Sequence, residues 1–241
     1  MNAFSIGLRE LPGYCGDSGY MLSPLHSVGR LLRRAGTELM KTNGTTGVWI
    51  DVGAHRGETS LFQARHNPGL KIFAIEPNLR VAARLVGLAS NYFVIPMAVA
   101  EKDGFADFHI NEFEASSSLL PLNDEGVKAW IGGEALRVKE TTTVATIRLD
   151  TLMDLAGIEE VDFLKIDAQG MDLAIVRSAG KRLRDILRIT LEVGVTGVPV
   201  YKGEPSKAEV LAFLDEAGFS LIKVEKQTHG QEENVTFVRN R

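Results

Sequence analysis

The feature that most constrains the fold is the stretch Val48-Trp49-Ile50-Asp51-Val52-Gly53-Ala54-His55-Arg56-Gly57. An apolar, β-prone run ends in a carboxylate and a Gly-x-x-x-Gly loop follows it, while residues 58–64 are typical of the start of a helix. Glycine has no Cβ atom, so the backbone can turn sharply there and a ligand can approach it closely. The helix start adds unpaired N–H groups and the positive end of a dipole. The pattern predicts a strand, a tight ligand-binding turn and a helix.

A second strand is predicted at 71–76, with Glu76 at its tip and Pro77 directly after it. Asp51 and Glu76 are 25 residues apart in sequence and are expected at the same end of a parallel sheet. Ligands of open α/β sheets bind at the carboxyl ends of the strands. Because a carboxylate accepts two hydroxyl hydrogen bonds, Glu76 suits the diol of a ribose.

Two ligands that contain a ribose fit such a loop, a dinucleotide and S-adenosylmethionine. The dinucleotide fingerprint is Gly-x-Gly-x-x-Gly, which places a pyrophosphate at the helix N-terminus. Here the spacing is Gly-x-x-x-Gly, and the carboxylate of Asp51 directly before the loop would repel a pyrophosphate. A ligand with a sulfonium and an α-amino group suits that position better. The loop favours S-adenosylmethionine, and a nicotinamide-dependent oxidoreductase is the alternative from another class.

Further motifs accompany these two strand ends. They are Ala74-Ile75-Glu76-Pro77-Asn78, Ala98-Val99-Ala100-Glu101-Lys102-Asp103-Gly104, Ile147-Arg148-Leu149-Asp150-Thr151-Leu152 and Phe163-Leu164-Lys165-Ile166-Asp167-Ala168-Gln169-Gly170. Together with residues 48–57, they resemble the FkbM-type S-adenosylmethionine-dependent methyltransferases. The resemblance runs from about residue 47 to the C-terminus, and the Lys-Ile-Asp-x-x-Gly element is its most specific part.

The resemblance implies an α/β fold with a doubly wound, Rossmann-like class I methyltransferase sheet. We expect the strand order 3-2-1-4-5-7-6, with an antiparallel last pair and an N-terminal helical extension. Residues 1–46 are predicted to form an arm and a helix, and residues 47–241 the methyltransferase domain. Ser206 and Glu209 form a capping-box pattern that predicts a further helix. The expected strands span 71–76, 92–95 reaching 98–99, 105–110, 142–149, 161–167, 187–193, 220–225 and 235–239, with a polar loop at 227–233.

The resemblance also assigns residues to the cofactor. Asp51 is expected beside the ammonium of the methionine part, directly or through water, and Glu76 at the ribose. His55 is a candidate contact of the cofactor carboxylate, and residues 97–103 are expected near the adenine. For Asp51 and Glu76, the alternative is a structural role as caps of the turns at the strand ends. The candidate cofactor-binding residues are Asp51, Gly53, Ala54, His55, Gly57, Thr59, Glu76, Pro77, Ala98, Val99 and Asp167.

The candidate catalytic residues are Asp167, Lys165 and Glu192. A hydroxyl acceptor needs a base that takes its proton, and Asp167 lies at the predicted tip of the fourth parallel strand. Lys165 shares one side of that strand with Asp167, so the alternative is a structural ion pair. Asp167 and Glu192 could also bind a divalent cation, but no third ligand is evident and no metal site is predicted. His109 is a weaker candidate base, since a lone histidine on a short strand is more often packed or exposed.

One position departs from the family pattern. Many members of the family have a glutamate where this chain has Gln169, which removes a charge beside the expected reaction centre. An acceptor pocket is expected to be built from the N-terminal arm and from residues 111–140 and 194–204. Phe113 and Trp130 either line that pocket or anchor their loop to the core.

Composition narrows the class of function. The chain has 241 residues, enough for one α/β domain with a small extension. A net charge of −4 argues against a general nucleic-acid binder. Cys15 is the single cysteine, so no intrachain disulfide or cysteine-based zinc site is expected. Without a long apolar run or a leader pattern, a cytoplasmic location is predicted; a homodimer stays open.

The leading hypothesis is an O-methyltransferase that acts on a hydroxyl of a small molecule, a sugar or a polyketide-like acceptor. The alternatives within the enzymes are N-methylation and methylation of a glycan-linked or lipid-linked acceptor. A third class is a non-catalytic subunit that binds S-adenosylmethionine, which the glutamine at position 169 keeps open.

Overall fold

The computed structural model describes residues 46–240. The expected N-terminal arm with its helix, and Cys15, lie outside the described residues. The division of the chain at residue 46 therefore stays a prediction.

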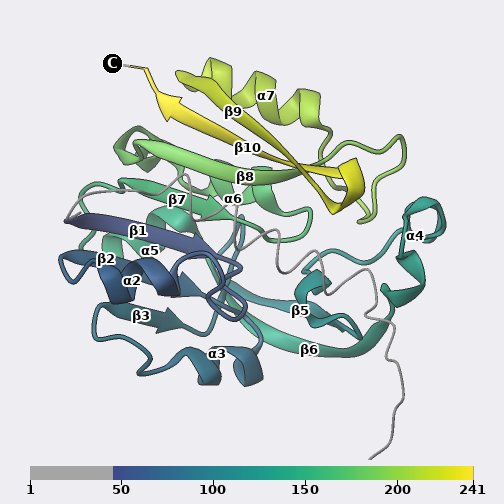
Figure 1. Ribbon diagram of the computed structural model, residues 1–241, viewed down its shortest axis with the longest axis horizontal. Helices are drawn as coiled ribbons and strands as arrows, with labels where there is room; N and C mark the ends of the chain where they lie inside the picture. The colour runs from purple at the N-terminus through teal and green to yellow at the C-terminus, as the bar shows by residue number, and fades with distance from the viewer. Residues whose placement is uncertain (1–45, 241) are drawn as a thin grey trace, which may run out of the picture.

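The core is a seven-stranded mixed sheet (Figure 1). Its order is β3-β2-β1-β7-β8-β10-β9, which is 3-2-1-4-5-7-6 when only its own strands are counted. The first five strands in this order are parallel, and β10 runs antiparallel to both of its neighbours. The predicted topology is confirmed. The strands are β1 (Gly47–Val52), β2 (Leu70–Ile75), β3 (Tyr92–Ile95), β7 (Phe163–Ile166), β8 (Arg188–Gly194), β9 (Phe219–Gln227) and β10 (Glu232–Arg239).

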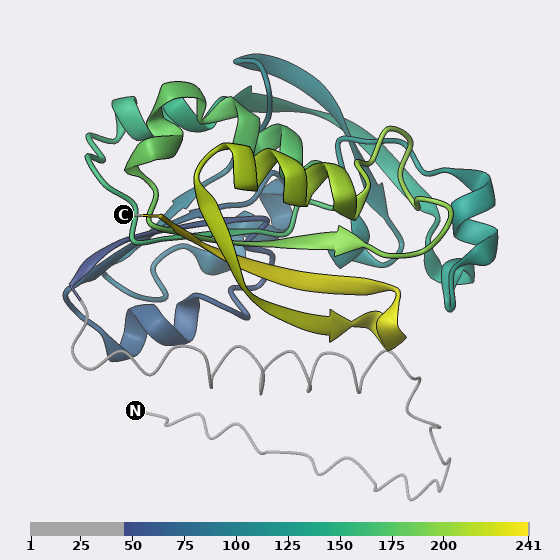
Figure 2. The ribbon, with the colours of Figure 1, turned by 90° about the horizontal axis from the view of Figure 1, so that it is seen from above.

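Helices cover the sheet on both faces (Figure 2). Alternation along β1 sends Ile50 and Val52 into the larger apolar core and Trp49 into a smaller one. The larger core contains residues of α5 (Leu149–Leu155), α6 (Asp172–Ser178) and α7 (Lys207–Glu216). The smaller core contains residues of α2 (Leu61–His66) and α3 (Leu79–Leu85). Asp51 therefore points to the side of α2 and α3.

A second, three-stranded sheet corrects two of the predicted strands. It has the order β4-β6-β5, with β4 (Ala98–Val99), β5 (Gly104–Asn111) and β6 (Val138–Ile147). The third strand of the core does not reach 98–99, because Pro96 has no N–H for the ladder and Met97 N turns back to Ile95 O at 3.0 Å. Residues 98–99 pair with β6 instead, and β6 is longer than predicted at its start.

The insertion at 112–137 contains three short helical segments at the carboxyl ends of the parallel strands (Figure 1). They are η1 (Glu114–Ser116), α4 (Asp124–Ala129) and η2 (Gly133–Ala135). A β-bridge between Leu122 and Tyr201 attaches the insertion to the loop after β8. Leu136 and Val200 pack in the same apolar cluster. Two of the three segments expected to form the acceptor pocket, residues 111–140 and 194–204, are therefore in direct contact.

Three details refine the predicted elements. The helix after the glycine loop begins at Leu61, because residues 55–60 form turns. The loop predicted at 227–233 is shorter, since β9 and β10 extend to η4 (Thr228–Gly230). The capping box of Ser206 and Glu209 is present at the start of α7. In the part of the chain that the structure describes, no helix has the length and apolarity to cross a membrane.

Candidate active site

The glycine loop turns between β1 and α2 in a way that requires glycine. Gly53 has φ 72° and Gly57 has φ 75°, which is the left-handed region. A Cβ atom on Gly53 would lie 1.9 Å from the carbonyl oxygen of Asp167, so no side chain fits there. The first glycine thus allows the loop to pack directly against the end of β7, where the candidate catalytic residues lie.

Asp51 and Lys165 form a buried pair behind this loop. The two residues are partners in the parallel register of β1 and β7, and Lys165 Nζ lies 3.2 Å from Asp51 Oδ1. Lys165 Nζ also donates to Gly53 O at 3.0 Å and lies 3.5 Å from Asp167 Oδ2. Ser60 Oγ donates to the other oxygen of Asp51. Both carboxylate oxygens of Asp51 therefore face protein groups, and the pair fixes the loop to the strand end.

The charge state of Lys165 follows from these contacts. Burial on its own lowers the pKa of a lysine, but the carboxylates of Asp51 and Asp167 raise the pKa of Lys165 above its usual value. Its ammonium group stays charged at physiological pH. It presents a positive charge to oxygen atoms of Asp51, Gly53 and Asp167.

Glu76 follows β2 and is buried. Its Oε2 accepts from His55 N and its Oε1 from Asn78 N, each at 2.8 Å. Burial raises the pKa of Glu76, although the two backbone N–H groups oppose the shift. Each carboxylate oxygen has a second lone pair, so the group can still accept two hydroxyl hydrogen bonds.

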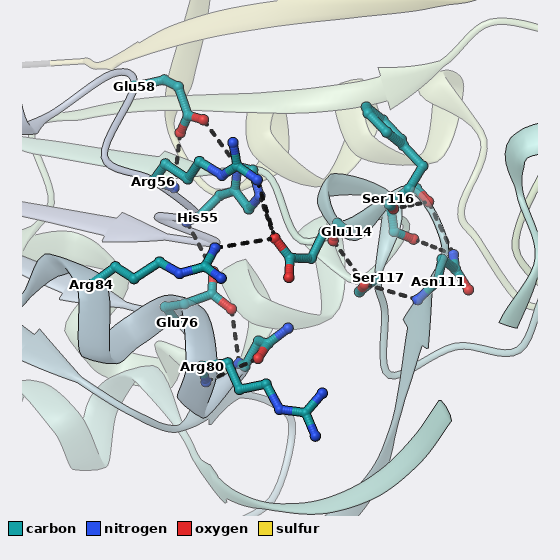
Figure 3. Close-up of polar contacts among 12 residues, drawn as sticks. His55, Arg56, Glu58, Glu76, Arg80, Arg84, Asn111, Glu114, Ser116 and Ser117 are labelled. Atoms are coloured by element: carbon teal, nitrogen blue, oxygen red, sulfur yellow. Dashed lines mark hydrogen bonds and ion pairs between the residues drawn. The ribbon is translucent and has the colours of Figure 1, made fainter. Parts of the chain in front are cut away.

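Charged side chains connect the glycine loop to the insertion (Figure 3). The carboxylate of Glu114 in η1 lies 3.4 Å from Arg56 Nη2, 3.8 Å from Arg84 Nη1 and 3.9 Å from His55 Nε2. His55 Nδ1 lies 3.0 Å from Glu58 Oε1. Glu114 thus bridges the loop and α3, which places the insertion over the loop that is expected to hold the cofactor.

These elements enclose a cavity of about 1560 Å³ at the carboxyl ends of the parallel strands. Most of the predicted site residues line it, as do Phe113 and Trp130. Asp51 and Gly57 are not part of its lining, and neither is His109, which contacts Thr141 on β6. The predicted residues that line the cavity are Gly53, Ala54, His55, Thr59, Glu76, Pro77, Ala98, Val99, Lys165, Asp167 and Glu192.

Carboxylates gather at the tips of β7, β8 and β10. The side-chain amide of Gln169 donates to Asp167 Oδ1 at 2.9 Å and to Glu192 Oε2 at 3.1 Å. Burial, with the charges of Glu232 and Asp167 next, raises the pKa of Glu192 well above its usual value. Burial also raises the pKa of Glu232 and that of Asp172 to about 7. Within residues 46–240, no group of three or more His, Cys, Asp or Glu side chains has the arrangement of a metal site.

Sequence reasoning missed several residues of this site. Ser60 and Tyr92 share a hydrogen bond of 2.9 Å behind Asp51, and Tyr201 Oη donates to Gln169 Oε1 at 2.8 Å. The sequence also did not single out Glu114, which pairs with Arg56 and Arg84, or Glu232, whose charge acts on Glu192. These residues come from separate elements and carry no local motif, so only the position of Ser60 within the loop offered a signal.

The comparisons with known proteins agree with this geometry. The family model "Methyltransferase FkbM domain" matches residues 51–221. The chain belongs to the FkbM methyltransferase family. This membership confirms the predicted family, and it identifies the matched segment as an S-adenosylmethionine-dependent methyltransferase domain.

Two relatives of the chain have methyltransferase names. The 2-O-methyltransferase NoeI of Sinorhizobium fredii is 26% identical over 147 residues, which cover 56% of this chain and 58% of NoeI. The chain thus spans a little over half the length of that relative. The methyltransferase sdnD of Sordaria araneosa is 24% identical over 211 residues, which cover 72% of this chain and 74% of sdnD.

Solved structures share the fold. Magnesium protoporphyrin IX methyltransferase from Synechocystis PCC 6803 matches with a TM-score of 0.51 in its complex with SAM and 0.52 in its complex with SAH. Both matches cover 94% of this chain, and they cover 87% and 90% of those chains at 9% identity. The class I methyltransferase fold predicted from the sequence is confirmed.

Proposed function

We propose that this protein transfers a methyl group from S-adenosylmethionine to a hydroxyl of a small molecule, such as a sugar or a polyketide-like acceptor. One observation carries the proposal. A single cavity contains the glycine loop and Glu76 on one side and the carboxylates of Asp167 and Glu192 on the other. Family membership and the name of NoeI, a 2-O-methyltransferase, support a hydroxyl acceptor.

The residues present fit the cofactor. Glu76 is buried at the cavity wall with lone pairs left for the ribose hydroxyls. Pro77, Ala98 and Val99 line the wall beside it and suit an adenine ring. When bound, S-adenosylmethionine supplies an electrophilic methyl group on a sulfonium and leaves as a neutral thioether. The protein therefore has to supply position, exclusion of water and a group that accepts a proton.

Asp167 is the candidate base. Its Oδ1 accepts from Gln169 and its Oδ2 faces the ammonium of Lys165, so its carboxylate has a defined direction. The acceptor oxygen would form its bond to the methyl carbon while its proton passes to this carboxylate, and from there to water. Glu192 would hold the acceptor from the neighbouring strand, because both carboxylates line the cavity and bind the same amide.

An N-methyltransferase is the second candidate, and the charge of the cavity favours it. Asp167, Glu192 and Glu232 line the cavity, and acids with a raised pKa, such as Glu192 and Glu232, would ionise more readily beside a basic amine and attract it. Glycan-linked or lipid-linked acceptors also remain compatible with this cavity. A screen that pairs each hydroxyl acceptor with its amino analogue separates the two reactions by the position of the transferred label.

Cofactor binding is the first experiment. Isothermal titration of the purified full chain with S-adenosylmethionine, S-adenosylhomocysteine and NAD is expected to give micromolar binding of the first two and none of the third. Binding of NAD alone would mean an oxidoreductase and would overturn the proposal. Binding of S-adenosylmethionine without transfer of labelled methyl to any acceptor of the screen would favour a non-catalytic subunit.

We propose a cytoplasmic enzyme with a small-molecule acceptor. The net charge of −4 supports the absence of a nucleic-acid partner. Sedimentation of the full chain tests whether it forms a homodimer.

A further inference from the structure

Gln169 of the Lys-Ile-Asp-x-x-Gly motif contacts three other side chains of the candidate site, those of Asp167, Glu192 and Tyr201. It lies in the turn after β7, its amide nitrogen contacts two carboxylates, and its amide oxygen contacts Tyr201. We propose that Gln169 is a positioning residue that holds Asp167 and Glu192 as one unit and couples them to the acceptor wall. This inference rests on the proposed methyl transfer and deepens it.

The first step of the argument is charge. Two carboxylates that approach one another disfavour joint ionisation, unless a cation or a donor lies between them. The Gln169 amide has two N–H donors, and it gives one to Asp167 Oδ1 at 2.9 Å and one to Glu192 Oε2 at 3.1 Å. Lys165 faces Asp167 but is also engaged by Asp51 and Gly53. The amide therefore supplies one donor to each carboxyl group, and these donors favour the ionised forms against the burial that raises the pKa of Glu192.

The second step is the orientation of the amide. In the opposite orientation, its oxygen would face the two carboxylate oxygens and would require a proton on each of them. The observed orientation needs no such protons, and it leaves the oxygen for the hydroxyl of Tyr201 at 2.8 Å. Burial raises the pKa of Tyr201 well above its usual value, so the hydroxyl keeps its proton as a donor.

The third step is the connection to the insertion. Tyr201 Oη also lies 2.7 Å from Ser116 O, and Ser118 Oγ donates to the backbone carbonyl of Gln169 at 2.7 Å. A tyrosine hydroxyl has one proton and serves one acceptor at a time. The wall at 116–118 and the loop at 201 thus contact the same residue that binds both carboxylates. Movement of this wall by an acceptor would reach the carboxylates through Gln169.

The backbone shows that position 169 is constrained. Gln169 has φ 53°, the left-handed region that residues other than glycine and asparagine seldom adopt. Contacts from Ser118 and Tyr201 on the insertion side hold it there. This conformation offers a useful variant, since Gln169→Asn suits a left-handed backbone but shortens the amide by one methylene.

The experiment compares three variants of the full chain. Gln169→Asn keeps an amide that no longer reaches both carboxylates, and Gln169→Glu keeps the length but replaces the donors with a third carboxylate. Tyr201→Phe removes the hydroxyl that contacts the amide oxygen and Ser116 O, and it leaves the contacts of the amide nitrogen with both carboxylates in place. The readouts are the titration midpoints of Asp and Glu carboxyls labelled with carbon-13, read by NMR, and the pH profile of methyl transfer to an acceptor found in the screen.

We expect Gln169→Glu to raise the titration midpoints of Asp167 and Glu192 by about one pH unit or more, and Gln169→Asn to raise them less. The acid limb of the pH profile should move upward with them, while the affinity for S-adenosylmethionine stays within about twofold. Tyr201→Phe should leave the midpoints unchanged and raise the KM for the acceptor. Wild-type titration midpoints and a wild-type pH profile in both Gln169 variants would overturn the inference. A pH profile that shifts in Tyr201→Phe and in neither Gln169 variant would overturn it as well.

The two proposals fail separately. Absence of S-adenosylmethionine binding in the wild type would remove the proposed function, whereas the carboxyl midpoints still test the contact of Gln169 with its two partners. Thermal unfolding of each variant identifies one that does not fold. If Gln169→Glu does not fold, Gln169→Asn decides the outcome, because its backbone preference matches the native turn.

Discussion

Asp51 lies one residue before the end of β1, Glu76 lies directly after the end of β2, and the two acids have different surroundings. Asp51 is 2% exposed and contacts Ser60 and Lys165, whereas Glu76 lines the cavity. Asp51 therefore supports the loop from behind, and any effect it has on a bound ligand passes through Lys165 and the loop backbone. Glu76 is the acid whose side chain can contact the ligand directly.

This difference predicts different results for two alanine variants. Glu76→Ala should weaken S-adenosylmethionine binding by roughly 10–100-fold, because two hydrogen bonds to a charged group are lost. Asp51→Ala should instead reduce the free energy of unfolding by about 3 kcal/mol or more, because it leaves the buried Lys165 without its nearest charged partner. Isothermal titration and chemical denaturation of both variants measure the two effects. Equal losses of stability with equal affinity in the two variants would contradict this division.

Asp167 permits a test of the base. Asp167→Asn keeps the shape of the side chain and an acceptor for the Gln169 amide but cannot take a proton. It should slow methyl transfer by roughly 10²–10⁴-fold and leave S-adenosylmethionine affinity within about twofold. Single-turnover transfer of labelled methyl measures the rate. Glu160→Gln, an exposed residue before the start of β7, is the matched control, and a wild-type rate in Asp167→Asn would exclude it as the base.

At the scale of elements, local patterns predicted most of the core. The strands β1, β2 and β7 are mostly apolar and are followed by an acid or a glycine, β8 alternates apolar and polar residues, and the capping box defines the start of α7. The prediction that the third strand of the core reaches residues 98–99 was wrong. These residues pair with β6, which begins almost 40 residues later in the chain. Such long-range pairing leaves no local periodicity.

The candidate site divides in the same way. The glycine loop, Glu76 and the Lys165–Asp167 pair lie within motifs, so the sequence predicted their place at the strand ends. The contacts of Gln169 with Glu192 and Tyr201 join residues 23 and 32 positions apart in sequence. The contact of Glu114 with Arg56 joins residues 58 positions apart. No spacing rule predicts these contacts, because the tertiary fold alone brings the residues together.

The contacts of Glu114 in η1 with Arg56 and Arg84 are expected to slow the exchange of the cofactor. Glu114→Gln removes the charge that attracts Arg56 and Arg84, so η1 should separate more readily from the glycine loop. We expect S-adenosylmethionine to dissociate several-fold faster at low salt, while stability changes by less than about 1 kcal/mol, because the arginines are exposed. The effect should shrink as ionic strength rises. Stopped-flow displacement measures the rate.

A matched control comes from the neighbouring sheet. Glu140→Gln breaks the exposed ion pair between Glu140 of β6 and Arg80 of α3, which involves no residue of the glycine loop or of η1. This variant should exchange the cofactor at the wild-type rate. Equal exchange rates for Glu114→Gln and Glu140→Gln would show that η1 does not restrain the loop.

For the whole molecule, the buried acids at the carboxyl ends of the parallel strands determine how stability depends on pH. Asp172 is 3% exposed, and burial raises its pKa to about 7, with the charge of Asp167 as the next cause. Burial also raises the pKa of Glu232 to about 7. In the unfolded chain, such groups ionise near pH 4. Between pH 4 and 7, the folded state therefore binds more protons than the unfolded state.

The folded protein should consequently lose stability as the pH rises through this window. One unit of pKa is worth about 1.4 kcal/mol, so Asp172 alone should cost on the order of 4 kcal/mol between pH 4 and 8. The carboxylates with lowered pKa, such as Asp150, lose their contribution only at lower pH. Maximum stability is therefore expected at mildly acidic pH, and chemical denaturation of the full chain from pH 4 to 9 measures it.

Asp172→Asn isolates the main contribution to this slope. The variant cannot ionise, so its free energy of unfolding should fall less steeply than that of the wild type between pH 5 and 8. Asn keeps an oxygen for one of the two backbone N–H groups that Asp172 accepts, from Ala168 and Glu192. The exposed Asp215→Asn on α7 serves as the control and should retain the wild-type slope. Parallel curves for Asp172→Asn and the wild type would mean that Asp172 is already ionised in the folded state. The donors of Lys165 and the backbone would then suffice to hold the acids of this edge as charged groups.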